Sequence, residues 1–265
     1  MDGETQRKQL ARAKRIVVKI GTRSITDERH RLDPEKIGRL VSNVMGLRSR
    51  GKEVIIVSSG AIGAGVGRLN LNGRPKDIPA LQATAAVGQG MLMQVYSRYF
   101  GEYQQPVAQI LLTAEDFNDP KRYRNFRNML STLMRWGVVP IVNENDSVAA
   151  DEIRLGDNDI LSAYVAVGAS ADLLVILTDV DGLFMDYSRR GNRGKLIKTV
   201  DGTMKVERYV GRSFKGFGGM LTKIKAARMA TEKGIPVVIA NSNEEKVLER
   251  ILDGEEIGTL FLPVR

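Results

Sequence analysis

The alternation of short apolar runs with amphipathic segments constrains the fold of this chain most. Apolar runs with the length and composition of buried strands lie at Arg15–Ile20, Val54–Val57, Val107–Leu112, Val138–Val142, Leu173–Leu177 and Val237–Ala240. Segments with helical periodicity lie at Pro34–Arg50, Pro79–Tyr103, Lys121–Trp136, Leu161–Val167, Met220–Lys233 and Glu244–Leu252. This alternation predicts an α/β fold, a three-layer αβα sandwich whose central, mostly parallel sheet is covered by helices on both faces.

Local residues refine this prediction. Pro34 and Pro79 lie where first-turn prolines belong, because their missing N–H would have no helical partner. Asp33 is a plausible helix cap ahead of Pro34. The region from Met185 to Gly219 is rich in Gly, Arg and Lys and lacks apolar periodicity, so we expect loops or a flap there.

Composition excludes several classes of chemistry. The 265 residues include no cysteine, which excludes disulfides, zinc–thiolate sites and cysteine nucleophiles. The single histidine, His30, follows three charged residues and is interpreted as a surface loop residue. The net charge of +9 favours anionic partners such as nucleotides or acidic metabolites. The basic residues are scattered and form no RNA-binding motif, and no apolar run suggests a signal peptide or a membrane span, so neither nucleic acid nor membrane is an expected partner.

The segment Asn143–Asp159, NENDSVAADEIRLGDND, is the densest polar stretch after a predicted strand. It therefore lies at a strand's carboxyl end, where open α/β sheets keep their ligand crevices. Its carboxylates and amides suit a small substrate that makes many hydrogen bonds. The alternative is a solvated acidic loop with purely structural turn chemistry.

Three glycine-rich turns follow strand-like runs or enter helices. Gly21 follows Lys19, which brings a mobile positive charge close to exposed backbone. The turns Ser58–Gly65 and Gly216–Lys223 each lead into a helix, whose N-terminal N–H groups can hold an anion. Each turn taken singly could be structural. The Walker-type loop, the protein-kinase signature set and the GxGxxG fingerprint are all absent.

Together, these pieces resemble the amino-acid kinase family, and within it the glutamate 5-kinases. The resemblance spans Arg15 to Leu262 and is carried by VVKIGT (17–22), VSSGAIGAG (57–65), LQATAAVGQ (81–89), NENDSVAADEIRLGDNDILSA (143–163), LLVILTDVDGLF (173–184) and GFGGMLTK (216–223). The NEND and GDND blocks are specific to the glutamate 5-kinases. The other blocks are shared with acetylglutamate, aspartate, uridylate and carbamate kinases.

The chain departs from the family pattern in three places. Phe217 stands where the family usually has threonine, which removes a hydroxyl from the phosphate loop. Arg23 and Ser24 follow the first glycine where small or hydroxyl residues are commoner. The sequence ends at Arg265, soon after the kinase core, so we expect no C-terminal PUA domain.

The resemblance implies ATP-dependent phosphorylation of the side-chain carboxylate of L-glutamate, the first step of proline biosynthesis. A carboxylate is already ionised at neutral pH, so this reaction needs no general base. Lys19 and Lys223 would stabilise charge on the transferring phosphoryl group, with Asp159 holding both lysines and Mg²⁺ bridging the β- and γ-phosphates. A purely structural alternative makes Asp159 a helix cap.

The resemblance also implies the binding residues. Ser59, Asp146 and Asn158 match positions that bind glutamate, Asp146 suiting the α-ammonium and the other two its carboxylates. The matching nucleotide contacts are Lys19, Gly21, Thr178, Asp179, Gly218, Gly219, Met220, Leu221, Thr222 and Lys223. Thr178 and Asp179 could also be plain turn residues. No protein side chain is assigned as a metal ligand.

The expected organisation is a single domain over residues 1–265. A boundary near Ala169–Asp172 would divide a substrate half, about 1–170, from a nucleotide half, 171–265. The resemblance implies a cytoplasmic homo-oligomer, a dimer or tetramer, coupled functionally to glutamate-5-semialdehyde dehydrogenase. The alternatives are a family member with another carboxylate or phosphate substrate, a non-catalytic nucleotide-binding relative, or an RNA-binding protein supported only by the net charge.

Overall fold

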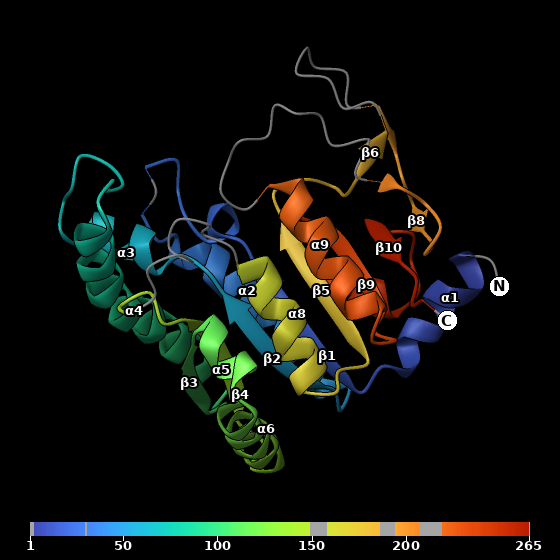
Figure 1. Ribbon diagram of the computed structural model, residues 1–265, viewed down its shortest axis with the longest axis horizontal. Coiled ribbons are helices and arrows are strands. Elements are labelled where there is room, and N and C mark those ends of the chain that lie inside the picture. Colours follow the sequence, from blue (N-terminus) through green and yellow to red (C-terminus); the bar gives the residue numbers. More distant parts are fainter. Residues whose placement is uncertain (1–2, 30, 149–157, 186–193, 207–218, 265) are drawn as a thin grey trace.

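An eight-stranded sheet forms the centre of the molecule, with strand order β3-β4-β2-β1-β5-β9-β10-β8 (Figure 1). The computed structural model describes residues 3–29, 31–148, 158–185, 194–206 and 219–264. The strands are β1 Arg15–Ile20, β2 Glu53–Ser58, β3 Val107–Leu112, β4 Val139–Glu144, β5 Leu173–Thr178, β8 Thr199–Val200, β9 Val237–Asn241 and β10 Thr259–Phe261. The β9–β10 pair is antiparallel and the other neighbours pair in parallel, as the alternating pattern predicts.

Several helices begin at an aspartate side chain that caps them. Their bounds are α1 Gly3–Gln9, α2 Pro34–Ser49, α3 Ala61–Arg68, α4 Ile78–Gly101, α5 Ala114–Asn118, α6 Pro120–Arg135, α8 Asn158–Gly168, α9 Met220–Thr231 and α10 Val247–Leu252. The Asp33 carboxylate accepts hydrogen bonds from the backbone N–H groups of Glu35 and Lys36, which confirms the predicted cap of α2. Asp77 caps α4 in the same way, and Pro79 lies in its first turn.

Helices cover both faces of the sheet, which confirms the three-layer prediction. On one face, Val17 and Ile55 belong to a core cluster that includes residues of α6, α8 and α9. On the other face, Ile16 and Val54 belong to a cluster that includes residues of α2, α4 and α10. Figure 1 shows α8 and α9 side by side in front of the sheet. Adjacent β1 residues thus face opposite layers, because side chains alternate along a strand.

Short elements escaped the sequence-based prediction. In the region predicted as loops or a flap, β7 (Lys195–Leu196) pairs with β6 (Phe184–Met185), and β8 forms an edge of the main sheet. The region expected to hold loops or a flap thus contains short strands that this expectation did not specify. Two-residue strands are too short to show a periodicity, and the same limit hid the three-residue β10.

The parallel strands bring one set of ends to a single edge of the sheet. The chain leaves β1 towards β2 through α2 on one face, whereas it enters β5 through α8 on the other face. The β1–β5 neighbours therefore form a topological switch point, where open α/β sheets bind ligands. The N-termini of α3, α8 and α9 follow strand ends or face them at this edge (Figure 1).

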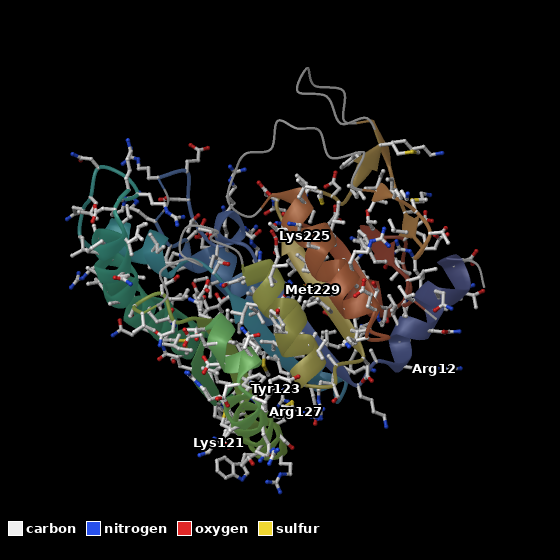
Figure 2. All side chains as sticks on the ribbon, in the orientation of Figure 1. Arg12, Lys121, Tyr123, Arg127, Lys225 and Met229 are labelled. Atoms are coloured by element: carbon white, nitrogen blue, oxygen red, sulfur yellow. The ribbon has the colours of Figure 1, made fainter. Side chains whose placement is uncertain are left out.

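Helix α6 carries basic residues together with aromatic rings that are committed to packing. Figure 2 shows Lys121, Tyr123 and Arg127 on this helix. Tyr123 packs against the core, and its ring lies 6.4 Å from that of the buried Phe126. These rings are thus placed for packing rather than for stacking on nucleic-acid bases. Among the helices of the described part of the chain, none is long and apolar enough to cross a membrane.

Candidate active site

Two lysines share one buried carboxylate at the switch point. Lys223 Nζ lies 3.0 Å from Asp159 Oδ2, and Lys19 forms an ion pair with Asp159 Oδ1. The exposed fractions of the Lys19, Asp159 and Lys223 side chains are 4, 0 and 6%. Both ammonium groups are therefore fixed next to a single carboxylate and can act on one anionic ligand.

The surrounding elements explain how these side chains meet. Lys19 is the next-to-last residue of β1, and Asp159 and Lys223 lie in the first turns of α8 and α9. The Thr222 hydroxyl lies 3.0 Å from Asp159 Oδ2 and 2.7 Å from the Gly219 carbonyl oxygen, which ties the start of α9 to α8. The Asp159 carboxylate thus contacts side chains from another element and does not serve only as a helix cap.

Asn158, the first residue of α8, connects the ends of two strands, β2 and β4. Its Nδ2 lies 2.5 Å from the Ser58 carbonyl oxygen, 2.7 Å from Asn143 Oδ1 and 3.2 Å from Ser59 Oγ. Asn143 and Asn158 are only 2 and 6% exposed. Two predicted substrate residues, Ser59 and Asn158, are thus in contact. Asn143, Asn158 and Asp159 of the acidic segment are buried, whereas Ser147 and Val148 are exposed.

Two residues of α4 complete this polar region. Gln89 Oε1 accepts a hydrogen bond of 2.8 Å from Asn143 Nδ2, and the Tyr96 hydroxyl lies 2.9 Å from Ser58 Oγ. Burial raises the pKa of Tyr96, although the hydrogen bond with Ser58 opposes the rise. Sequence reasoning assigned no role to Gln89 or Tyr96. The available sign of a role for Gln89 was that this polar amide follows a run of small and apolar residues.

Asp146 lies apart from this amide network. No hydrogen bond joins it to Ser59 or Asn158 in the portion of the chain that the structure describes. Burial raises the pKa of Asp146 to about 6, and the guanidinium of Arg74 opposes the rise. Arg74 belongs to the loop between α3 and α4, so this loop supplies a cation that sequence reasoning did not consider.

The predicted nucleotide positions line the ends of β1 and β5. The Gly21 backbone N–H donates to the Leu177 carbonyl oxygen at 3.3 Å, and Thr178 Oγ1 lies 3.2 Å from Asp179 Oδ1. Arg23 Nη1 lies 3.2 Å from Asp179 Oδ2, which bridges the two strand ends. Burial raises the pKa of Asp179, but the hydrogen bonds from Arg23 and Thr178 outweigh it and hold the pKa below its usual value.

The phosphate loop is described from Gly219 onward. Gly219 precedes α9 in an extended conformation, Met220 packs against the core, and Leu221 is 39% exposed. Gly218 and Phe217 lie outside the described residues, as do His30 and the middle of the acidic segment, 149–157. The described residues contain no group of three or more His, Cys, Asp or Glu side chains that could hold a metal ion.

Residues 14–241 match the amino acid kinase family. The chain belongs to this family. This amino acid kinase is 49% identical over 255 residues to glutamate 5-kinase of Caldanaerobacter subterraneus subsp. tengcongensis, covering 95% of this chain and 68% of that protein. It is 51% identical to glutamate 5-kinase of Dictyoglomus thermophilum, with coverages of 95 and 68%. The glutamate 5-kinase of Methanosarcina mazei is also 51% identical, with coverages of 98 and 71%.

Solved structures agree on the fold of this amino acid kinase. The UMP kinase of Bacillus anthracis superposes with a TM-score of 0.65 at 17% identity, covering 96% of this chain and 97% of that one. The carbamate kinase of Giardia lamblia, solved with AMP-PNP, gives a TM-score of 0.67 at 18% identity, covering 96 and 100%. At these identities the likeness establishes the shared fold.

Proposed function

We propose that this amino acid kinase transfers the γ-phosphoryl group of ATP to the side-chain carboxylate of L-glutamate, giving L-glutamyl 5-phosphate. The observation that carries the proposal is the buried pairing of Lys19 and Lys223 with Asp159, directly beside Asn158. Relatives that are 49–51% identical and named glutamate 5-kinase support the choice of substrate. The reaction is the first step of proline biosynthesis.

The chemistry needs positioning and charge stabilisation. Phosphoryl transfer passes through a transition state with charge spread over the phosphoryl oxygens and the leaving group. Lys19 and Lys223 would stabilise that charge from a buried position, where electrostatic interactions are stronger than in water. Asp159 would hold both ammonium groups at a fixed spacing. The acceptor carboxylate is already ionised at neutral pH, so no side chain needs to remove a proton.

The glutamate pocket is proposed to combine Ser59, Asn158 and Asp146. Ser59 and Asn158 lie together at the end of β2 and the start of α8. The Asp146 carboxylate would attract the α-ammonium group of the substrate. Its raised pKa makes this attraction dependent on pH near 6.

The nucleotide is proposed to lie across the ends of β1 and β5 and the start of α9. Lys19, Gly21, Thr178 and Asp179 would contact it from the strands, and the loop Gly218–Lys223 would cover its phosphates. Backbone N–H groups at the N-terminus of the 12-residue α9 favour an anion there. Lys19 and Lys223 would act on the phosphates from the protein side, and Mg²⁺ bound with ATP would supply further neutralisation of phosphate charge.

The two halves of the chain are proposed to divide this work. Ser59, Asp146 and Asn158 precede the boundary near residue 170, and Thr178 and Lys223 follow it.

We propose a cytoplasmic homo-oligomer, a dimer or tetramer. Its product is a reactive acyl phosphate, which supports functional coupling to glutamate-5-semialdehyde dehydrogenase as the consuming enzyme.

A coupled ADP-release assay tests the substrate. The purified chain is given ATP, Mg²⁺ and, in separate reactions, L-glutamate, N-acetylglutamate, L-aspartate or UMP. The proposal predicts turnover with L-glutamate that far exceeds the other three. Strong turnover with another acceptor and little with glutamate would overturn it.

A further inference from the structure

Three buried side-chain amides form a chain of hydrogen bonds that ends at the proposed glutamate pocket. Gln89 Oε1 accepts from Asn143 Nδ2 at 2.8 Å, and Asn143 Oδ1 accepts from Asn158 Nδ2 at 2.7 Å. Their exposed fractions are 9, 2 and 6% for Gln89, Asn143 and Asn158. Buried polar groups that are linked by hydrogen bonds fix each other's orientation.

The orientation of Asn143 follows from a backbone group. The Glu144 N–H, which can only donate, is 2.9 Å from Asn143 Oδ1. The oxygen of this amide must therefore point towards Glu144 and Asn158, and its NH₂ group must point towards Gln89. Gln89 therefore faces Asn143 with its oxygen, and among the described residues its Nε2 is buried with no hydrogen-bond partner. An unpaired buried NH₂ group is costly, and the hydrogen bond between Asn143 and Gln89 Oε1 forms in this structure despite that cost.

The orientation of Asn158 follows in turn. Its Nδ2 faces Asn143 Oδ1 and the Ser58 carbonyl oxygen, both of which can only accept. The nitrogen end of this amide is therefore committed to the protein. Asn158 Oδ1 has no hydrogen-bond donor among the described residues, so the group that Asn158 offers to a ligand is an acceptor.

We propose that Asn143, held by Gln89, is a positioning residue that turns Asn158 Oδ1 towards the amino-acid substrate, where it accepts a hydrogen bond from the α-ammonium group. This inference rests on the proposed function, and its polarity differs from the sequence-based expectation that Asn158 faces a carboxylate. Ser59 Oγ lies 3.2 Å from Asn158 Nδ2, a group that cannot accept, so the Ser59 O–H is left to donate to a substrate carboxylate. Acceptors would thus select the ammonium end, and a hydroxyl donor the carboxylate.

Truncated substrates test this polarity. Glutarate lacks the amine of glutamate, and 4-aminobutyrate lacks the α-carboxylate but keeps the amine. Dissociation constants for glutamate and both analogues are measured by calorimetry on the full chain and on Asn158→Ala. We expect Asn158→Ala to weaken glutamate and 4-aminobutyrate about tenfold or more, the scale of a hydrogen bond to a charged group, and glutarate less than about threefold. A loss seen with glutarate but not with 4-aminobutyrate would overturn the proposal.

Two variants of Asn143 test the positioning role. Asn143→Leu removes the acceptor for Asn158 and should raise the glutamate KM about tenfold or more with a smaller change in kcat. Asn143→Asp should recover most of that affinity, because its carboxylate accepts from Asn158 and Glu144 while Gln89 rotates to donate Nε2. Equal losses in both variants, or a loss confined to kcat, would contradict the positioning role.

A crystal structure with glutamate provides the second measurement if a variant does not fold or the analogues bind too weakly. The α-ammonium within hydrogen-bond reach of Asn158 Oδ1 is expected, and a carboxylate in that place would overturn the polarity. If the unchanged chain neither binds nor turns over glutamate, the proposed function fails. If it binds glutamate with the opposite polarity, only this inference fails.

Discussion

Lys223 Nζ lies 3.0 Å from Asp159 Oδ2 although both side chains are almost fully buried. The contact joins the first turn of α9 to the first turn of α8. Lys19 of β1 pairs with the other oxygen of the same carboxylate. One side chain therefore sets the relative positions of three elements that carry the proposed catalytic charges.

Asp159→Asn should lower both the rate of catalysis and the stability of the fold. The amide keeps the shape of the side chain but removes the negative charge between Lys19 and Lys223. We expect kcat to fall about 10²–10³-fold, the scale seen when a transition-state contact is lost. Breaking a buried ion pair should also lower the free energy of unfolding by about 3–5 kcal/mol, measured by urea unfolding.

Asp253→Asn is the matched control for that substitution. Asp253 pairs with Arg50 at 2.7 Å, but its side chain is 53% exposed. The free energy of unfolding should change by less than about 1 kcal/mol, and kcat should be unaffected. Similar effects in both variants would show that the Asp159 result reflects a general loss of charge.

The glutamate KM should depend on pH through Asp146. Its pKa of about 6 means that the carboxylate becomes protonated, and loses its attraction for the α-ammonium, below that pH. We expect KM to rise about tenfold per pH unit below pH 6. Asp146→Asn should have a high KM with little change between pH 6.5 and 5.5. If Asp146→Asn kept the same pH dependence of KM as the unchanged chain, Asp146 would be excluded as the source of that dependence.

The raised pKa of Asp146 also predicts how the free energy of unfolding depends on pH. The folded protein holds the Asp146 proton more tightly than the unfolded chain, because burial raises the folded pKa above 3.8. The contribution of Asp146 is therefore most favourable below pH 3.8 and declines as the pH rises to about 6. Urea unfolding of the unchanged chain and Asp146→Asn over this window measures it. Their difference should change in this direction and level off above pH 6.

Gly88→Ala should separate the α3 and α4 helices. A Cβ on Gly88 would lie 1.8 Å from the Ala61 carbonyl oxygen at the start of α3. We expect the free energy of unfolding to fall by about 1–3 kcal/mol. The glutamate KM should rise as well, because Ala61 follows the turn that carries Ser59.

Gly90→Ala on the same helix is the control. Apart from its chain neighbours and the backbone of its own helix, no atom of the described residues lies within 4 Å of a Cβ at this exposed position. Alanine should therefore stabilise the protein by about 0.5–1 kcal/mol through its higher helix propensity. Thermal unfolding of both variants gives the comparison, and destabilisation by Gly90→Ala would contradict this account of α4.

Arg23→Ala should affect the nucleotide more than the fold. The Arg23 side chain is 81% exposed, so losing its pair with Asp179 should change the free energy of unfolding by less than about 1 kcal/mol. Removing this cation beside an anionic ligand should raise the ATP KM several-fold, about 1 kcal/mol or less. Arg23→Lys keeps the charge and should retain most of the affinity. An unchanged ATP KM in Arg23→Ala would exclude Arg23 from the nucleotide site.

The longer elements were predictable because their buried positions are occupied by apolar residues at regular spacing. Apolar runs placed β1, β3 and β5 within a residue of their observed bounds, and Asp33 and Pro34 marked the start of α2. The strands β8 and β10 were not predictable, since two or three residues carry no periodicity. They exist because the sheet edge offers hydrogen-bond partners, which is a property of the assembled fold.

Motif resemblance identified the charged residues of the site but not their supports. The motifs alone indicate three charged residues, and the structure brings them together: Lys19, Asp159 and Lys223. Gln89 received no role because its partner Asn143 is 54 positions away in the chain. The orientation of a side-chain amide depends on such distant partners, so the acceptor character of Asn158 required the three-dimensional network.

Trapping the product tests the central claim most directly. Hydroxylamine converts an acyl phosphate to a hydroxamate, so L-glutamate, ATP, Mg²⁺ and hydroxylamine should give glutamyl hydroxamate with the unchanged chain. Lys223→Ala should form at least about 10²-fold less product per unit time while remaining folded by circular dichroism. Hydroxamate formation that depends on ATP and glutamate and disappears in Lys223→Ala is the predicted result. No hydroxamate from the unchanged chain, or undiminished formation by Lys223→Ala, would contradict the account.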